Sequence, residues 1–453
     1  MEIHDARRRN LAKESKMGGD GKWCRMAPAS MPSTDNQTTI TPSCSSSGSG
    51  SAPRPLVAAQ CLRERNGFVW LDSSLGNSTE EGTHGISLLA TDPDLILEGG
   101  PADWHLLERE LETRRRVSPN VGVPDGAAIG FFRFDGSFRF GFYDHPHIHI
   151  PEGWFGGTAF PVGELTEAHP GPAKDSPAAP ASFQPEMERA DYVAMVRAAQ
   201  EYVASGDIYQ VCLAHRFSTR FEGDPWSLYL ALRSASPAPH AAYLKLGDET
   251  VLSSSPECFL RMSGRAISTR PIKGTRPRGR NPDEDTREAF ELQTSPKEIA
   301  ELVMITDLER NDLGSVCEYG SVTASQLLQL ERFAQVFHLV STVEGTLRKD
   351  VSQVAALAAC FPGGSISGAP KKRALEIIRE LEPVPRGLFT GAIGYFGYNG
   401  ESQFNIAIRT VVIRDGRAEF HVGAGITADS SPEKEWEETL HKAAGILQAA
   451  RGL

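Results

Sequence analysis

The sequence predicts an α+β protein in which sheets and helices are segregated rather than arranged as a doubly wound fold. Residues 127–143 alternate Phe and Gly, which indicates a pair of strands. Strand signals at 243–246, 249–253 and 258–262 follow one another without a helix between them, so we expect neighbouring antiparallel strands. Strands and helices then mix with no regular βαβ rhythm, and no repeat of about 20–50 residues is visible.

Length and composition describe an ordinary globular chain. At about 100–200 residues per domain, 453 residues allow roughly two to four domains or one large domain. Hydrophobic residues make up 40% of the chain and charged residues 23%. Because no run approaches the ~18 apolar residues of a membrane helix, we do not expect an integral membrane protein.

The chain is acidic, with 47 Lys and Arg against 58 Asp and Glu and a net charge of −11. Such a balance does not attract nucleic acid or an anionic membrane, so we expect neither as a partner. A small acidic substrate would need a local positive cluster or a metal ion. The seven cysteines show no CxxC spacing, which argues against a disulfide scaffold or a zinc site and indicates a reducing cytoplasm.

Residues 1–54 predict a disordered N-terminal extension. They begin with a run of arginines at 7–9, continue with Pro, Ser and Thr, and end in a Ser/Gly run at 45–50, which is too polar to form a core. The acidic residues Glu2 and Asp5 argue against a transit peptide, and no apolar segment follows as in a secretory signal. A start codon placed too far upstream is the other interpretation.

Three segments follow the extension. Residues 55–165 predict a β-rich subdomain, with its first strand at 68–71. Residues 166–188 are rich in Pro, Ala and Gly and predict a linker. A helix over 189–204, with apolar residues at helical spacing, opens the remaining domain at 189–453.

Two predicted helices begin with the same pattern, a Ser-Pro pair followed by two carboxylates three residues apart. The first offers Glu298 and Glu301, and the second offers Glu435 and Glu438. Residues three apart lie on one helix face, so the four carboxylates together suit a hard cation such as Mg²⁺. The alternative is local, because Ser295 and Glu298 also match a capping box and acidic first turns favour the helix dipole.

Two glycine-rich runs could bring backbone close to a ligand. The first, at 362–371, leads into a predicted helix over 371–381 whose free N–H groups would bind an anion. It lacks the GK[ST] of a Walker A loop, and an ordinary turn is the alternative. The second, at 423–425, either admits a ligand or marks a bulge.

A basic loop is predicted at 268–279. Its Lys273 could act as a nucleophile if burial or the neighbouring arginines lowered its pKa, and is otherwise a solvated charge. Glu257, at the start of a strand, is a candidate general acid. His338 is by default a hydrogen-bonded core residue.

These segments together resemble one enzyme family over about residues 190–450, with a weaker likeness over 55–165. The motifs that carry the resemblance are Gly-Asp-Ile-Tyr-Gln-Val (206–211), Ser-Pro-Glu (255–257), Pro-Ile-Lys-Gly-Thr (271–275), the run 301–314, Ser-Gly-Ala-Pro-Lys (367–371), Tyr-Phe (395–396), Arg409, Gly-Ala-Gly (423–425) and Glu438-Thr439 with Lys442. The family is that of the chorismate-utilising enzymes, which includes anthranilate synthase component I, aminodeoxychorismate synthase component I, and isochorismate and salicylate synthases. The resemblance implies two antiparallel β-sheets packed as a sandwich and flanked by helices.

Two positions separate members of this family. Water-using isochorismate enzymes carry a Lys base where this chain has Gln210, which favours ammonia as the nucleophile. Anthranilate synthases carry Ala where this chain has Lys273. At this position the chain resembles the aminodeoxychorismate synthases of p-aminobenzoate and folate biosynthesis, which carry Lys. Cys212 departs from the family pattern, which usually has Asn there.

The implied reaction converts chorismate and ammonia to 4-amino-4-deoxychorismate. Lys273 would attack C2 while Glu257 protonates the departing C4 hydroxyl. The resemblance assigns Mg²⁺ to Glu298, Glu301, Glu435 and Glu438. The substrate contacts that it implies are Gln210, Gly274, Thr275, His338, Ser365, Arg409, Gly425 and Lys442.

Ammonia is expected from a separate glutamine amidotransferase subunit, because no further segment of ~200 residues remains for a glutaminase domain. One alternative is anthranilate synthase component I of tryptophan biosynthesis. Another is a non-catalytic subunit that only binds an effector. The effector pocket that the resemblance implies would use Ser73, Pro239, His240 and Ala241.

Overall fold

The structure is a computed structural model that describes residues 54–73, 86–118, 122–150, 153–156, 181–333 and 335–452. The extension predicted for 1–54 lies outside these residues except for Arg54, and so does the first part of the linker predicted for 166–188. The division into segments at 55–165 and 189–453 stays a prediction.

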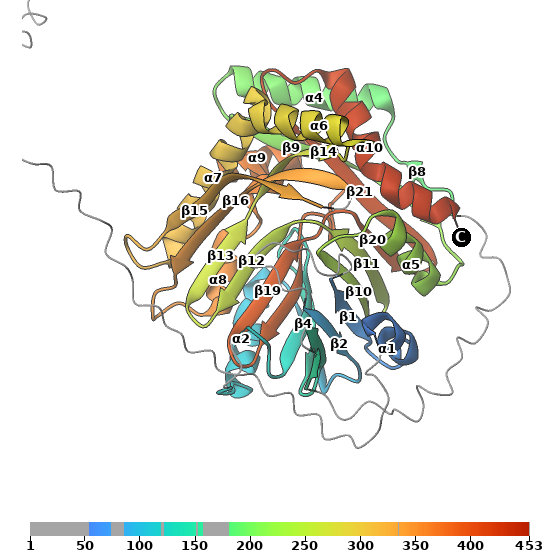
Figure 1. Cartoon of the computed structure of the whole chain (residues 1–453), viewed down its shortest axis with the longest axis vertical. Helices are drawn as coiled ribbons and strands as arrows, with labels where there is room; N and C mark the ends of the chain where they lie inside the picture. Colours follow the sequence, from blue (N-terminus) through green and yellow to red (C-terminus); the bar gives the residue numbers. More distant parts are fainter. Residues whose placement is uncertain are drawn as a thin grey trace, which may run out of the picture. The chain divides into compact units, whose positions relative to one another are not determined.

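The described strands form two antiparallel sheets, which confirms the predicted fold class (Figure 1). The first has eleven strands in the order β17 (Gly368–Ala369), β9 (Gln210–Arg220), β21 (Arg417–Ile426), β20 (Thr410–Arg414), β11 (Glu249–Ser255), β10 (His240–Leu246), β1 (Val69–Asp72), β2 (Ser87–Ala90), β6 (His147–Ile150) and β7 (Gly153–Phe155), with β8 (Gln184–Pro185) beside β9. The second has ten strands in the order β14 (Ile272–Pro277), β16 (Val336–Thr346), β13 (Ala266–Arg270), β12 (Cys258–Ser263), β19 (Glu401–Ile406), β18 (Ala392–Gly397), β4 (Ala127–Phe132), β5 (Phe138–Tyr143) and β3 (Leu95–Gly99), with β15 (Thr323–Arg332) beside β16. Strands from the N-terminal part of the chain therefore extend both sheets.

Strand β4 shows how the sequence builds the layers. Successive side chains of a strand point to opposite faces. Ile129 and Phe131 pack in the cluster between the sheets, whereas Phe132 packs in the cluster on the outer face of the second sheet. Both faces are apolar because both are buried. The strand signal at 127–143 is confirmed, and the structure divides this segment into β4 and β5, which pair with each other.

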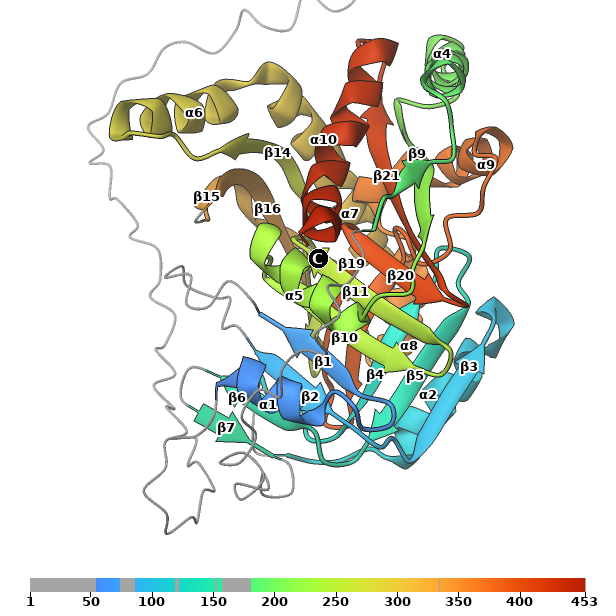
Figure 2. The ribbon, with the colours of Figure 1, turned by 90° about the vertical axis from the view of Figure 1, so that its right-hand side faces the viewer.

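Helices cover the outer face of each sheet (Figure 2). On the first sheet these are α1 (Pro55–Leu62), α5 (Pro225–Ala235) and α10 (Pro432–Arg451). On the second they are α2 (Trp104–Thr113), preceded by η1 (Pro101–Asp103), α7 (Pro296–Val316) and α8 (Gln353–Cys360). Near β9 and β14 lie α4 (Arg189–Ala204), α9 (Lys371–Leu381), α6 (Pro282–Thr294) and η2 (Gly364–Ile366). The bounds of α4 and α9 are those that the sequence predicts.

Two local predictions are wrong. The strand signal at 258–262 is not a neighbour of β11, because the chain crosses at Pro256 and Glu257 and β12 pairs with β13 and β19 in the other sheet. The basic segment 268–279 is not a loop either, because β13 and β14 both pair with β16. Each segment has one partner that is distant in the sequence, β19 for β12 and β16 for β13 and β14, and local composition did not reveal these partners.

Candidate active site

A cavity of about 660 Å³ brings together the residues that the resemblance implied. Its walls come from β9, β14, β16 and β21, from the segment around η2, and from α7 and α10. The predicted residues that line it are Glu257, Lys273, Gly274, Thr275, Glu298, Glu301, His338, Ser365, Arg409, Gly425, Glu438 and Lys442. Gln210 and Glu435 are buried next to it without lining it.

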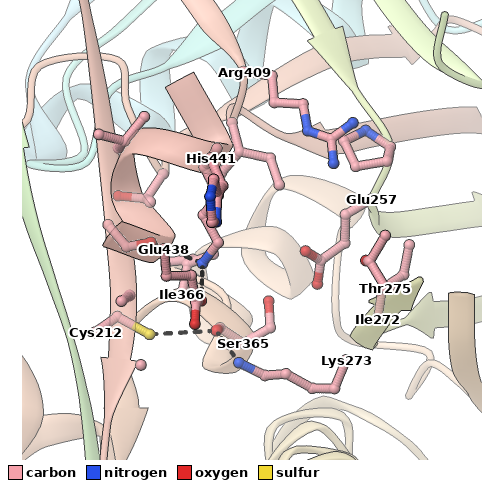
Figure 3. A pocket seen from close by; sticks show the side chains of 18 of the residues that line it. Cys212, Glu257, Ile272, Lys273, Thr275, Ser365, Ile366, Arg409, Glu438 and His441 are labelled. Carbon is pink, nitrogen blue, oxygen red and sulfur yellow. Dashed lines mark hydrogen bonds and ion pairs between the residues drawn. The ribbon is translucent and has the colours of Figure 1, made fainter. Parts of the chain in front are cut away.

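Lys273 reaches the cavity because β14 is bulged next to it. The pairing with β16 shifts register between Lys273 and Thr275, and Gly274 between them has a φ of +72°. A Cβ on Gly274 would lie 2.6 Å from the Leu292 side chain, so glycine is required here. The Lys273 Nζ atom donates to the carbonyl of Ser365 at 3.4 Å (Figure 3).

The pKa of Lys273 is shifted in the opposite direction from the one that a nucleophilic amine requires. Burial lowers the pKa of Lys273, but the Cys212 sulfur and the carboxylates of Glu301, Glu257 and Glu438 raise it by more, so this pKa lies above its ordinary value. The neighbouring arginines do not lower it because they face carboxylates of their own. The ion pairs are Arg270–Glu331, Arg276–Glu298 and Arg278–Asp285.

Glu257 occupies the crossing between the two sheets and is buried. Burial raises the pKa of Glu257, and this effect exceeds the lowering by a hydrogen bond with the Ser365 side chain and by the charge of Lys273. A raised pKa helps a carboxyl group to hold a proton, which suits a general acid. Figure 3 shows Glu257 and Lys273 approaching Ser365 from two sides.

Arg409 supplies positive charge at another wall of the cavity. In the described part of the chain its guanidinium has no ion pair and no side-chain hydrogen bond, and burial lowers the pKa of Arg409. His338 pairs with Thr275 across β16 and β14, and its Nδ1 lies 2.9 Å from the Thr275 hydroxyl. Burial and the charge of Arg409 lower the pKa of His338 to about 4, so its imidazole is neutral. An unpaired cation beside neutral polar groups suits an anionic substrate.

The carboxylates from α7 and α10 converge on the cavity. Burial raises the pKa of Glu301, and the charges of Glu298 and Glu438 raise it further. Burial also raises the pKa of Glu435, whereas the Lys442 charge lowers that of Glu438. Mg²⁺ prefers oxygen ligands, and a cation would relieve the repulsion between these carboxylates. The four glutamates are therefore the kind of ligands that suit this ion.

The carboxylates are not arranged as a formed metal site. Among the described residues, no three His, Cys, Asp or Glu side chains are close enough together to hold a metal ion. Three of them contact cations instead, in the pairs Glu438–Lys442 at 2.8 Å, Glu301–Lys297 at 3.8 Å and Glu298–Arg276 at 3.9 Å. Metal binding would therefore require these side chains to turn.

Gln210 lies behind Gly425 rather than in the cavity wall. A Cβ on Gly425 would lie 2.4 Å from the Gln210 amide nitrogen, so glycine is needed for this approach. The Gln210 amide is fully buried and neither of its polar atoms has a hydrogen-bond partner. Cys212, which pairs with Gly425 across β9 and β21, directs its sulfur to the Ser365 carbonyl at 3.5 Å.

The predicted effector residues lie apart from the cavity lining. Ser73 follows β1, whose Asp72 pairs with Ala241 on β10, so the structure brings this strand end beside the Pro239–Ala241 segment. Burial lowers the pKa of His240 to about 4, and its Nδ1 lies 3.0 Å from the Gln403 amide. Effector binding stays a prediction.

Several lining residues were not singled out from the sequence. His441 lies three residues after Glu438 on α10, a helical spacing that would have revealed it. Arg386 and His421 belong to no motif, and no sequence signal marks them. Arg386 pairs with Glu382 at 2.6 Å and donates to the carbonyls of Ile366 and Cys212.

Comparisons with known proteins give a consistent result. Residues 158–448 match the family described as chorismate binding enzyme. The chain is 46% identical over 282 residues to anthranilate synthase component 1 of Synechocystis sp., covering 60% of this chain and 56% of that protein. It is 47% identical over 269 residues to the protein of the same name from Thermus thermophilus, covering 59% of this chain and 58% of that one. The chain thus spans less than two thirds of the length of these relatives.

Solved structures share the fold. Anthranilate synthase component I from Streptococcus pneumoniae TIGR4 superposes with a TM-score of 0.72 at 28% identity, covering 82% of this chain and 94% of that one. A putative 2,3-dihydroxybenzoate-specific isochorismate synthase from Bacillus anthracis gives 0.67 at 21% identity, covering 86% and 99%, which supports the fold alone. None of the described helices has the length and apolar character needed to cross a membrane.

Proposed function

Because this chain belongs to the chorismate binding enzyme family, we propose that it aminates chorismate at C4 to give 4-amino-4-deoxychorismate. One observation carries the proposal: Ser365 accepts from the Lys273 amine through its carbonyl, and its side chain is near enough to the Glu257 carboxyl to lower the pKa of that group. A nucleophile and a general acid held by one residue suit a displacement in which both act on the same ring.

The proposed reaction has two displacements. The neutral amine of Lys273 forms a bond to C2, both double bonds of the ring shift by one position, and the C4–O bond breaks as Glu257 gives its proton to the departing oxygen, which leaves as water. Ammonia then forms a bond to C4, both double bonds shift back, and the C2–N bond to Lys273 breaks. Arg409 would bind a carboxylate of the substrate, since its guanidinium faces the cavity without another partner.

Mg²⁺ is part of the proposal. Glu298, Glu301 and Glu438 would hold it from the cavity wall, with Glu435 buried next to Glu438 on α10. Bound there, the ion would offset the negative charge of the substrate carboxylate in an acidic protein. Its arrival would free Lys442 and Lys297 from their present ion pairs.

Ammonia would come from a separate glutamine amidotransferase in the cytoplasm. The relatives are named component 1, which supports a second component. The purified chain should therefore use ammonium at high pH and should not use glutamine until such a subunit is added. Glutamine-dependent turnover by the chain alone would contradict this partnership.

Amination at C2, as in anthranilate synthase, is the second candidate. It is favoured by the names of the relatives, several of which are 44–47% identical to this chain. It gives Lys273 no part in bond formation, because ammonia itself would attack C2.

The test is to incubate the protein with chorismate, Mg²⁺ and ammonium and to identify the product. The proposal expects the 4-amino product and, without ammonia, a covalent adduct that maps to Lys273 by mass spectrometry. Lys273→Ala should lower amination by roughly a hundredfold or more, or divert it to the 2-amino isomer, while chorismate still binds. Anthranilate from the parent protein with no adduct would favour the second candidate, and no product at all would favour a non-catalytic effector-binding subunit.

A further inference from the structure

The segment 363–367 determines where Lys273 and Glu257 meet. Its central residue, Ser365, accepts from Lys273 Nζ through the carbonyl at 3.4 Å and lines the same cavity as Glu257. The three residues come from separate segments, since Lys273 lies on β14, Glu257 directly before β12, and Ser365 in η2. A shift of the Ser365 backbone would therefore displace both groups.

Glu309 on α7 binds the backbone of this segment on the N-terminal side of Ser365. Its Oε1 atom accepts from the Gly364 N–H at 2.9 Å, one residue before Ser365. The side chain is only 3% exposed, and its Oε2 atom has no hydrogen-bond partner. A Cβ on Gly364 would lie 2.7 Å from Leu308 and 3.0 Å from Glu309 Oε1, so the close approach requires glycine.

Arg386 binds the backbone of the same segment on the C-terminal side of Ser365. Its guanidinium donates to the Ile366 carbonyl at 3.2 Å and to the Cys212 carbonyl at 2.8 Å. The Ser367 hydroxyl closes the turn by donating to the Gly363 carbonyl at 2.9 Å. Ser365 thus lies between two buried charged side chains that bind the backbone on either side of it.

The Glu309 carboxyl group is costly to bury. Burial raises its pKa to about 7, although the Lys371 charge and the Gly364 hydrogen bond lower it. Lys371 is engaged elsewhere, in an ion pair with Asp312 and a hydrogen bond to the Cys360 carbonyl. Among the described residues, Glu309 makes its one hydrogen bond with the Gly364 N–H. Holding this backbone group is therefore the role that the structure gives to the buried carboxyl.

We propose that Glu309 is a positioning residue, which fixes Ser365 through Gly364 and thereby aligns Lys273 with Glu257. The proposal rests on the proposed function only in taking Lys273 and Glu257 as the reacting groups. It predicts that loss of the acceptor at Oε1 slows the chemical step without weakening substrate binding, because Arg409 and the carboxylates of α7 and α10 lie elsewhere in the cavity wall.

Three variants test the proposal. Glu309→Leu removes the acceptor and should lower kcat by about tenfold to a hundredfold, with KM for chorismate within about twofold of the parent. Glu309→Gln keeps an acceptor oxygen and should stay within about threefold of the parent kcat. Asp312→Asn is the matched control, since Asp312 is a buried carboxylate on the same helix that pairs with Lys371 and not with the segment 363–367. It should lose stability and keep its kcat.

A second measurement does not require turnover. The rate at which a small amine-reactive reagent modifies Lys273, followed by peptide mass spectrometry, should change by about threefold or more in Glu309→Leu and stay unchanged in the other two variants. If Glu309→Leu does not fold, Glu309→Ala takes its place with the same expectations.

The outcomes separate the two proposals. A folded Glu309→Leu protein with parental kcat and parental Lys273 modification would overturn the positioning role, and so would an equal loss of kcat in Asp312→Asn. If the parent protein does not aminate chorismate, the proposed function fails, and the Lys273 modification rates alone decide the role of Glu309.

Discussion

The ionisable groups of the cavity are each shifted by their surroundings, and the shifts differ in direction. Burial raises the pKa of Glu257, which favours the protonated carboxyl, and burial lowers that of His338 to about 4, so the imidazole is neutral. The carboxylates around Lys273 raise its pKa despite burial, so the amine is held as a cation. In the proposed reaction the raised pKa of Glu257 suits its role as acid, whereas the Lys273 amine must first lose a proton.

Removing a carboxylate next to Lys273 should make its amine more reactive. Glu301 is the first carboxylate among the groups that raise the pKa of Lys273, so Glu301→Gln lowers this pKa and increases the neutral fraction at a fixed pH. Below the pKa, modification of Lys273 by an amine-reactive reagent should rise about tenfold per pH unit, and Glu301→Gln should be faster throughout. Peptide mass spectrometry measures both rates without Mg²⁺.

The exposed Glu291 on α6 supplies the control for this measurement. Glu291→Gln removes one negative charge away from the cavity lining and should leave the Lys273 rate unchanged. Equal or slower modification in Glu301→Gln would contradict the charge assignment.

The starts of α7 and α10 look alike in sequence and differ in structure. Ser295 caps α7 by accepting from the Glu298 N–H at 3.4 Å, whereas Ser431 makes no side-chain cap bond to α10. The Glu298 carboxylate faces the cavity. Capping in α7 therefore belongs to the Ser295 side chain, and the Glu298 side chain is left for another role.

These two roles predict opposite phenotypes. Ser295→Ala should cost about 1 kcal/mol of stability and leave amination intact, because it removes a cap. Glu298→Gln and Glu438→Gln should abolish the Mg²⁺-dependent activity with little change in stability. Each replaces a negatively charged carboxylate of the proposed Mg²⁺ site with a neutral amide. Thermal melts and rates measured in parallel distinguish the two, and a large melting shift with normal Mg²⁺ dependence in Glu298→Gln would contradict the metal assignment.

In the described part of the molecule, the packing that supports the cavity joins segments that are far apart in the sequence. Phe132 on β4 packs against Trp104 of α2 with its ring tilted, and the ring also contacts Phe140 and Phe404. It is fully buried on the outer face of the second sheet, whose far strands carry Lys273 and His338. The N-terminal strands are therefore part of the scaffold of the residues that line the cavity.

Truncating this ring should destabilise the whole protein without altering the chemistry. Phe132→Ala should cost about 3–5 kcal/mol, because it removes apolar contacts and leaves a cavity in a dense aromatic cluster. Denaturant unfolding measures the loss. The kcat per folded molecule should stay at the parental value, and a change in kcat greater than the unfolded fraction explains would show that the N-terminal strands act on the site directly.

The sequence by itself determined the fold class, the helices α4 and α9, the strands within 127–143 and twelve of the residues that line the cavity. These follow from signals that lie within a short stretch of chain: helical spacing, Phe/Gly alternation, and motifs whose residue types are specific to one chemistry. The same motifs named Lys273, Glu257 and Arg409 without showing how they meet.

Only the tertiary structure decided the charge on Lys273, the sheet to which β12 belongs and the contact of Glu309 with Gly364. Each depends on partners distant in sequence. Lys273 is surrounded by Glu301 and Glu438 from two helices, and β12 pairs with β19, a strand near the other end of the chain. Electrostatic and packing energies fall off with distance in space and are indifferent to separation along the chain, so no local pattern carries them.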